Sequence, residues 1–246
     1  MLAVIGGSGL SRLASLEVNE RRAARTPYGE PSGALLFGTV AGKPVMFLAR
    51  HGYGHTIAPH EVNYRANVWA LRDAGATRVV SVASVGGIRL DCEPGALVVP
   101  NQLLDYTWGR ASTYFEGPEQ PVTHIDFTHP YSESVRKALL RAGADCNERL
   151  VDGGVYATTQ GPRLETAAEI NRLERDGADL VGMTAMPEAV LARELGLEYG
   201  AIAVVVNYAA GRGTSAAGID LIEIEAVLQQ AMVRVRRIIE ALLART

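Results

Sequence analysis

The sequence predicts an α/β fold, and three observations lead to this prediction. Short apolar runs, such as Leu2–Ile5 and Ala201–Val206, have the length and the branched side chains of buried strands. Several of these runs end in glycine or polar residues, and segments of helical periodicity lie between them. The 246 residues, 48% of them hydrophobic, are enough to bury a full core. Because there is no internal repeat and no linker, we expect a single domain over residues 1–246.

The expected elements follow in order along the chain. Apolar runs predict strands over 2–5, 34–40, 43–49, 78–82, 95–99 and 201–206, with a hairpin around Ala41-Gly42. Helical spacing predicts helices over 63–74, 131–143 and 219–244. The residues from 154 to 207 contain two further strand exits and a helix start, and we expect the functional groups to gather there.

Three connecting segments have a composition that suggests a role. The small residues at 83–87 indicate a turn, whose backbone either contacts a ligand or only reverses the chain. The segment 104–130 is irregular and rich in Tyr, Thr and His, which favours a subunit contact. The glycine-rich segment 209–218 is either a mobile lid over a site or an ordinary surface loop.

Composition excludes several classes of function. A net charge of -3, with scattered arginines, argues against nucleic-acid binding. Cys92 and Cys146 lie far apart and lack a Cys-x-x-Cys partner, so we expect neither a metal cluster nor a disulfide framework, and we expect a reducing cytoplasm. We expect no signal peptide and no membrane segment, since no apolar run approaches the roughly 20 residues of a membrane helix.

Two polar clusters follow predicted strands in the first quarter of the chain. Gly6-Gly-Ser-Gly9 is either a tight turn or an anion cradle in which backbone N–H groups and Ser8 meet an oxyanion. A dinucleotide fingerprint does not fit, because Arg12 occupies the place of its last glycine. The second cluster, Arg50-His51-Gly52-Tyr53-Gly54-His55, favours an anion site over a metal site, since no carboxylate or cysteine lies at ligand spacing.

The stretch from 154 to 207 supplies three more polar groups. Glu165 precedes a helix start, Thr184 follows the short apolar run that ends in Val181-Gly182, and Asn207 ends the strand 201–206. Ligands of open α/β sheets collect where strands end and loops begin. These groups form no pair of a nucleophile and a base. They are better suited to hold a polar heterocycle and an anion.

Five short blocks of the chain carry a resemblance. They are Gly6-Gly-Ser-Gly9, Ala49-Arg-His-Gly52, Val62-Asn-Tyr-Arg-Ala-Asn67, Gln160-Gly-Pro-Arg-Leu-Glu-Thr166 and Gly182-Met-Thr-Ala-Met-Pro-Glu188. In this order they resemble the signature blocks of the trimeric purine nucleoside phosphorylase and methylthioadenosine phosphorylase family. The resemblance implies a three-layer α/β/α fold with a twisted, mixed central sheet, assembled as a homotrimer or a dimer of trimers.

The resemblance also implies a reaction and a set of site residues. Inorganic phosphate, the co-substrate, attacks C1′ of a purine nucleoside and releases the base and a pentose 1-phosphate, without metal or organic cofactor. The positions that match phosphate-binding residues are Ser8, Arg50, His51, His55, Ser84 and Thr184. Those that match base- and ribose-binding residues are Val85, Gly86, Leu164, Glu165, Met183, Asn207 and Ala209. Catalytic roles are expected for Asn207, Glu165 and His55.

Glu165 and Asn207 favour a 6-oxopurine. Hypoxanthine presents a carbonyl oxygen at C6 and an N1–H donor, which an amide and a carboxylate can bind. The methylthioadenosine phosphorylases of the family typically have Ser at the position of Glu165 and acids at those of Asn207 and Ala209. Adenine would place its bare N1 against the carboxylate, and such a mismatch lowers turnover by roughly 10⁴-fold.

The end of the site that takes the 5′ group is expected to be apolar, and we assign His124, Ile219 and Ile222 to it. By resemblance, the histidine comes from a neighbouring subunit. An apolar wall suits a methylthio group better than a hydroxyl. The predicted reaction is therefore phosphorolysis of S-methyl-5′-thioinosine to hypoxanthine and 5-methylthioribose 1-phosphate. The alternatives are a general inosine and guanosine phosphorylase, a methylthioadenosine phosphorylase, and a purine or phosphate binder without catalysis.

Overall fold

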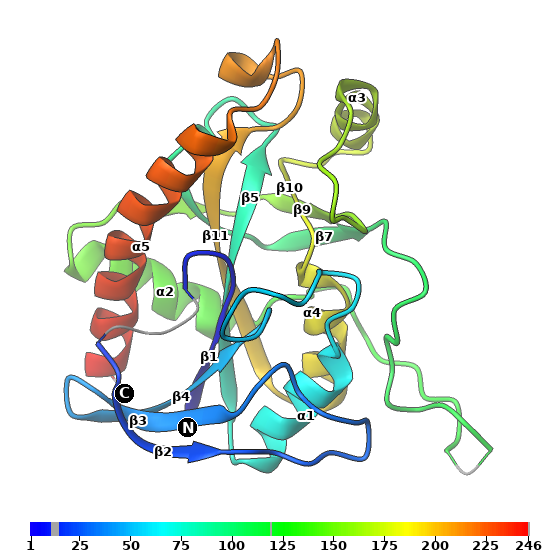
Figure 1. Cartoon of the computed structure of the whole chain (residues 1–246), viewed down its shortest axis with the longest axis vertical. Coiled ribbons are helices and arrows are strands. Elements are labelled where there is room, and N and C mark those ends of the chain that lie inside the picture. The colour runs from blue at the N-terminus through cyan, green and yellow to red at the C-terminus, as the bar shows by residue number, and fades with distance from the viewer. Residues whose placement is uncertain (11–14, 119, 246) are drawn as a thin grey trace.

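A computed structural model describes residues 1–10, 15–118 and 120–245 (Figure 1). Arg12, which interrupts the dinucleotide pattern, lies outside these ranges. The strands are β1 (Leu2–Gly6), β2 (Glu17–Arg22), β3 (Leu35–Val40), β4 (Lys43–Ala49), β5 (Arg78–Gly87), β6 (Leu97–Val99), β7 (Gln102–Asp105), β8 (Val151–Asp152), β9 (Val155–Thr158), β10 (Leu180–Gly182) and β11 (Glu198–Tyr208). The helices are α1 (Tyr64–Asp73), α2 (Glu133–Asp145), α3 (Ala167–Arg175), α4 (Ala185–Glu194), α5 (Leu221–Ala244) and the 3₁₀ turn η1 (Gly213–Ser215).

The strands form one mixed sheet. Its main path runs β2-β3-β4-β1-β5-β10-β9-β7, and β11, β6 and β8 continue from the other edge of β5. Strands β4, β1, β5 and β11 are parallel, whereas β2 and β3 join by antiparallel pairing. The mixed α/β architecture that the sequence predicted is confirmed.

Helices cover both faces of the sheet, which gives three layers (Figure 1). On one face α5 and α2 pack over the centre of the sheet, and their buried residues, among them Met232 and Leu139, form one core cluster with β1, β5 and β11. On the other face α1 and α4 bury a second cluster that contains Leu71 and Leu191. The sheet is therefore held between two apolar layers, and polar groups collect at the strand ends.

Strand β5 changes partner along its length, and this opens a site. Residues Arg78–Ser81 pair with β1, which ends at Gly6. Further along the same edge, Gly86 and Gly87 pair with the antiparallel β10. The space between the end of β1 and the end of β10 is open to side chains from the loops that follow both strands. Ligands of α/β sheets bind at such places.

The structure corrects two expectations about strands. The residues 83–87 are not a turn, because β5 continues to Gly87 and pairs with β11 as far as Tyr208. Gly87 allows close packing there, because a Cβ at this position would lie 1.9 Å from the carbonyl oxygen of Cys92. Strand β2 was not predicted, because its side chains are all exposed and only its edge pairing with β3 makes it a strand.

Candidate active site

A pocket of about 570 Å³ lies at this place beside β5. It brings together residues from seven parts of the chain. The predicted residues that line it are Ser8, Arg50, His51, His55, Ser84, Val85, Gly86, Leu164, Glu165, Met183, Thr184, Asn207, Ala209 and Ile219. Two predicted residues, His124 and Ile222, do not line it.

The glycine turn and Arg50 meet at one end of the pocket. Strands β1 and β4 are parallel and in register from Leu2↔Val45 to Gly6↔Ala49, so Ser8 and Arg50 follow neighbouring strand ends. The backbone N–H of Arg50 donates to the carbonyl of Gly6 at 2.9 Å. Gly7 lies so close that a Cβ there would be 2.8 Å from Nη1 of Arg50. The guanidinium therefore lies directly against the glycine segment for which the sequence allowed either a tight turn or an anion cradle.

Arg50 is fully buried and is held by Glu188. Its Nε and Nη2 donate to the two carboxylate oxygens of Glu188 at 2.8 and 3.0 Å, and both side chains are inaccessible to solvent. Nη2 also donates to Ser81 Oγ at 2.6 Å, and Nη1 donates to the carbonyl of Val82 at 3.1 Å. Burial by itself would lower the pKa of Arg50, but the Glu188 carboxylate raises it above its usual value.

This network leaves Arg50 one group for a ligand. A guanidinium has five N–H donors. Within the described part of the chain, four of them are used by Glu188, Ser81 and Val82, and the second N–H of Nη1 is not. Tyr199 fixes the other side of the pair, because its hydroxyl donates to Glu188 at 2.8 Å. The cation is thus preorganised with one donor left beside Gly7.

His51 and His55 follow Arg50 along the pocket wall. Burial, and then the charge of Arg50, lower the pKa of His51 to about 4, so its ring is neutral at neutral pH. Nδ1 of His51 lies 2.8 Å from the carbonyl oxygen of Ile57 and therefore carries the proton, which leaves Nε2 as an acceptor. His55 is exposed, its ring centroid is 4.6 Å from that of His51, and burial followed by Arg50 lowers its pKa.

Thr184 lies on the segment between β10 and α4. It is 6% exposed and occupies the N-cap position of α4 without making a side-chain capping bond. Its hydroxyl therefore does not satisfy the helix start, unlike most threonines at this position. Met183, the residue before it, also lines the pocket. Met183 and Thr184 thus line the same pocket as Arg50 and Glu165.

Glu165 is placed by the start of α3. The next residue, Thr166, forms a capping box with Glu169, in which each side chain accepts a hydrogen bond from the other's backbone N–H. The Thr159 hydroxyl donates to Oε1 of Glu165 at 2.6 Å. Oε2 makes no such bond to the described residues, so it is free to accept from a ligand. The sequence analysis missed Thr159, because it lies just outside the matched block Gln160–Thr166.

Asn207 reaches the pocket because β11 contains a bulge. The pairing of β11 with β5 shifts between Val205 and Asn207, which leaves Val206 as an extra residue. Neighbouring residues of a regular strand point to opposite faces, but here both Val206 and Asn207 line the pocket. One amide hydrogen of Asn207 is donated to the Tyr208 carbonyl at 2.6 Å. The other hydrogen and the amide oxygen remain for a ligand.

The start of α5 provides the apolar end of the pocket, with one correction to the prediction. Ile219 lines the pocket, but Ile222 is 84% exposed and does not. Asp220 caps α5 by accepting from the backbone N–H groups of Ile222 and Glu223. This places Leu221 and Ile224, three residues apart on one helix face, toward the pocket. Ile222 is on another face of the same turn.

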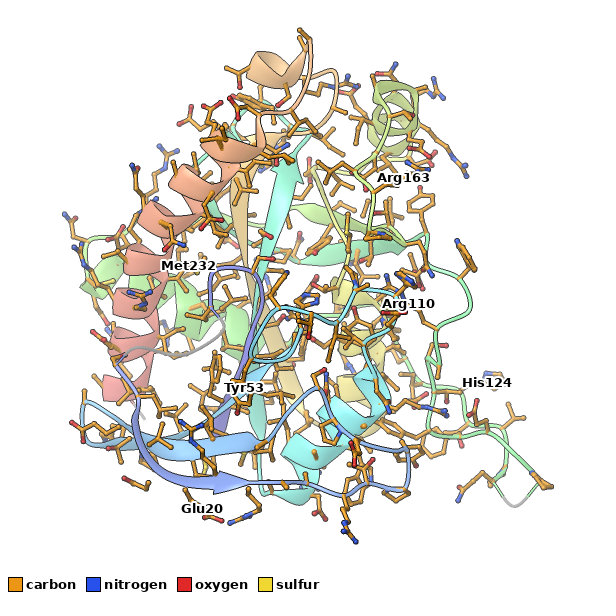
Figure 2. The ribbon with its side chains drawn as sticks, viewed as in Figure 1. Glu20, Tyr53, Arg110, His124, Arg163 and Met232 are labelled. Carbon is orange, nitrogen blue, oxygen red and sulfur yellow. The ribbon has the colours of Figure 1, made fainter. Side chains whose placement is uncertain are left out.

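His124 is exposed on the long segment between β7 and α2, on the outer side of the molecule in Figure 2. It does not line the pocket of its own chain. A role at the 5′ group would therefore need a second subunit.

Comparison with known proteins decides the family. A model described as the phosphorylase superfamily matches residues 1–244.

The chain belongs to the phosphorylase superfamily.

This phosphorylase is 53% identical over 234 residues to a probable S-methyl-5'-thioinosine phosphorylase of Pseudomonas syringae pv. tomato, with 95% of this chain and 94% of the relative covered. It is 44% identical over 215 residues to a 6-oxopurine nucleoside phosphorylase of Pyrococcus furiosus, covering 85% and 80%. Its structure matches methylthioadenosine phosphorylase from Schistosoma mansoni in complex with adenine, with a TM-score of 0.94, 33% identity and coverage of 99% and 90%. The family resemblance of the five blocks is confirmed.

The described part of this phosphorylase contains neither a metal-ligand cluster nor a membrane helix. No group of three or more His, Cys, Asp or Glu residues there is arranged to hold a metal ion. No helix there is long and apolar enough to cross a bilayer.

Proposed function

We propose that this phosphorylase catalyses the phosphorolysis of S-methyl-5′-thioinosine to hypoxanthine and 5-methylthioribose 1-phosphate. One observation carries the proposal. A single pocket combines an anion end at Ser8 and Arg50, a base wall with Glu165 and Asn207, and an apolar end at Leu221. The similarity to the Pseudomonas syringae relative supports the same substrate. Phosphate, the purine base and the 5′-methylthio group then each have a matching surface in this pocket.

The anion end would hold phosphate. Arg50 offers its remaining Nη1–H beside the glycine turn, and Ser8, Ser84 and Thr184 add hydroxyl donors. The neutral His51 presents Nε2 as an acceptor, so it suits the protonated oxygen of HPO₄²⁻. In this arrangement phosphate is bound and oriented toward C1′ of the nucleoside, which is the main task of a site without a covalent intermediate.

The base wall would stabilise the leaving purine. As the bond between C1′ and N9 breaks, the sugar becomes positively charged and the purine becomes negatively charged. The Asn207 oxygen accepts from N7–H, its free N–H donates to O6, and Glu165 accepts from N1–H. HPO₄²⁻ loses one proton when the ester forms, and the purine gains one at N7, so protons and charge balance. Phosphate is then the only co-substrate required, and we propose that no metal or organic cofactor takes part.

A comparison of four nucleosides tests the proposal. Phosphate-dependent base release is measured for inosine and adenosine, each with a 5′-hydroxyl and with a 5′-methylthio group. We expect methylthioinosine to have the highest kcat/KM and the adenine compounds to be lower by up to roughly 10⁴-fold. Equal or better turnover of methylthioadenosine would refute the base assignment. Base binding without release in the presence of phosphate would refute catalysis.

A second candidate is a general phosphorylase of 6-oxopurine nucleosides. The observation in its favour is the similarity to the Pyrococcus furiosus relative. Both candidates share the base wall and differ only at the 5′ end, where Ile219, Leu221 and Ile224 favour the apolar group. Inosine turned over as well as methylthioinosine would favour this second candidate.

We further propose that residues 1–246 act as one domain and assemble as a homotrimer, or as a dimer of trimers. One sheet contains all the described strands from β1 to β11, and this supports a single domain. Trp108 and Val122, which are 72% and 80% exposed in the isolated chain, support a subunit contact through the segment 104–130. In such an assembly His124 could reach the neighbour's 5′ end. Light scattering tests the assembly, and a monomer would refute it.

We propose a cytoplasmic location, which suits the free thiols of Cys92 and Cys146.

A further inference from the structure

Arg110 is a half-buried cation that neither the motifs nor the pocket lining singles out. It lies in the irregular segment between β7 and α2, and Figure 2 shows it on the inner side of that segment, unlike His124. The guanidinium carbon of Arg110 lies 5.5 Å from the ring centroid of Tyr64 in α1, and the Tyr64 hydroxyl is 3.4 Å from Nη1. No carboxylate among the described residues forms an ion pair with it.

The guanidinium of Arg110 instead binds carbonyl oxygens of two separate segments. Nη2 donates to the carbonyls of Thr159 and Gln160 at 3.3 and 3.0 Å, and Nε donates to the Gln160 side-chain oxygen at 3.2 Å. Nη1 donates to the carbonyls of Met183 and Met186 at 2.8 and 2.6 Å. A single planar side chain thus joins the residues after β9 to the residues after β10.

These two segments carry opposite parts of the proposed site. The first continues from Thr159, which holds the Glu165 carboxylate, to the base wall. The second contains Met183 and Thr184, which lie between the base wall and the anion end. Strands β9 and β10 are paired as far as Thr158 and Gly182, and the Thr159 N–H donates to the Gly182 carbonyl at 2.8 Å. Among the described residues no backbone hydrogen bond joins the two segments beyond Thr159 and Gly182, so the ladder does not fix their separation there. Met186 also leaves helical geometry, with φ -112° and ψ 137°.

We propose that Arg110 is a positioning residue, which sets the separation between the purine-binding and phosphate-binding segments. This inference rests on the proposed function for its kinetic readouts. Arginine suits the task because its rigid fork addresses carbonyls on two sides at once, whereas lysine is a point charge that can follow only one of them. Loss of the fork should disturb both ends of the pocket together, and this distinguishes Arg110 from residues that touch only one substrate.

The test compares Arg110→Ala, Arg110→Lys and the control Arg65→Gln. Arg65 anchors the same irregular segment through the Thr113 carbonyl and Glu116 but makes no hydrogen bond or ion pair to the described residues 159–160 or 183–186. For Arg110→Ala we expect KM to rise about tenfold or more for both phosphate and nucleoside, since hydrogen bonds from a charged group to both segments are lost. Arg110→Lys should recover only part of this loss, and Arg65→Gln should keep both KM values.

Chemical rescue and hydrogen exchange give readouts that a general loss of stability would not move. Millimolar guanidinium or methylguanidinium should restore activity to Arg110→Ala by severalfold, at concentrations that leave the wild type unchanged. Amide exchange should accelerate in residues 159–165 and 183–187 of Arg110→Ala, and not in β6. Unchanged KM values, or a loss confined to one substrate, would overturn the inference. So would a fall in kcat alone without rescue.

The two proposals fail in different ways. If the wild type prefers another purine nucleoside, the substrate assignment fails, but the Arg110 variants can be tested with that nucleoside. If the wild type releases no base at all, the proposed function fails, and hydrogen exchange still tests whether Arg110 holds the two segments. If the wild type is active and Arg110→Ala matches it in KM and exchange, only the inference on Arg110 fails.

Discussion

Replacing Glu188 by Gln tests the buried support of the anion end. The substitution keeps the shape of the side chain but removes the negative charge that faces Nε and Nη2 of Arg50. Both side chains are 0% exposed, so the remaining cation cannot be solvated in place. Breaking a buried pair by removing one partner costs about 3–5 kcal/mol. For a chain of this size we expect Tm to fall by about 6–20 °C.

The same substitution should weaken phosphate binding. Glu188 orients the guanidinium so that its free Nη1–H lies beside Gly7. Losing one well-aligned hydrogen bond to a charged ligand costs about 1.5–3 kcal/mol, which corresponds to a KM for phosphate that is about 10- to 100-fold higher. The KM for the nucleoside should change much less. Calorimetry and initial-rate kinetics at varied phosphate measure the two effects.

Two further variants separate stability from function. Glu198→Gln is the matched control, because the side chains of its pair with Arg78 are 40% and 47% exposed and such a pair is worth about 1 kcal/mol or less. The triple variant Arg50→Met, Glu188→Leu, Tyr199→Phe replaces the buried network by apolar groups, and such replacements are often neutral or stabilising. It should recover Tm but not phosphate-dependent activity. A Glu188→Gln protein with wild-type Tm and wild-type KM for phosphate would refute the reasoning.

Three other predictions concern the remaining parts of the pocket. The pKa of His51 is lowered from 6.5 to about 4, so the unfolded state binds more protons than the folded state between pH 6.5 and about 4. The free energy of unfolding should therefore fall by about 3 kcal/mol as the pH drops through this range. Urea unfolding between pH 4 and 7 should show a shallower fall for His51→Gln, and parallel curves would contradict this. Asn207→Ala should lower kcat by roughly two orders of magnitude through loss of the purine contacts, and an unchanged kcat would remove Asn207 from the mechanism. Leu221→Asp should raise the KM for methylthioinosine by about tenfold or more, whereas the exposed Ile222→Asp should not, and equal effects of the two would refute the assignment of helix faces.

The sequence by itself determined the class of fold and most members of the pocket. Buried strands such as β1 and β4 are visible because their apolar residues are contiguous, and the polar residues that follow them fall at the same sheet edge once the strands are parallel. The resemblance to a family then assigned roles to Ser8, Glu165 and Asn207, and these line one pocket. These features depend on local pattern, which a single sequence contains.

Only the tertiary structure decided how those residues are held. Glu188 is 138 residues from Arg50 in sequence, so no spacing could reveal that it neutralises this cation. The bulge at Val206 depends on the register of β11 against β5, and the choice of Leu221 over Ile222 depends on where the cap of α5 begins its first turn. Arg110 binds carbonyl oxygens, which every residue has and no motif marks. Partners that are distant in sequence, and backbone groups, become visible only when the chain is folded.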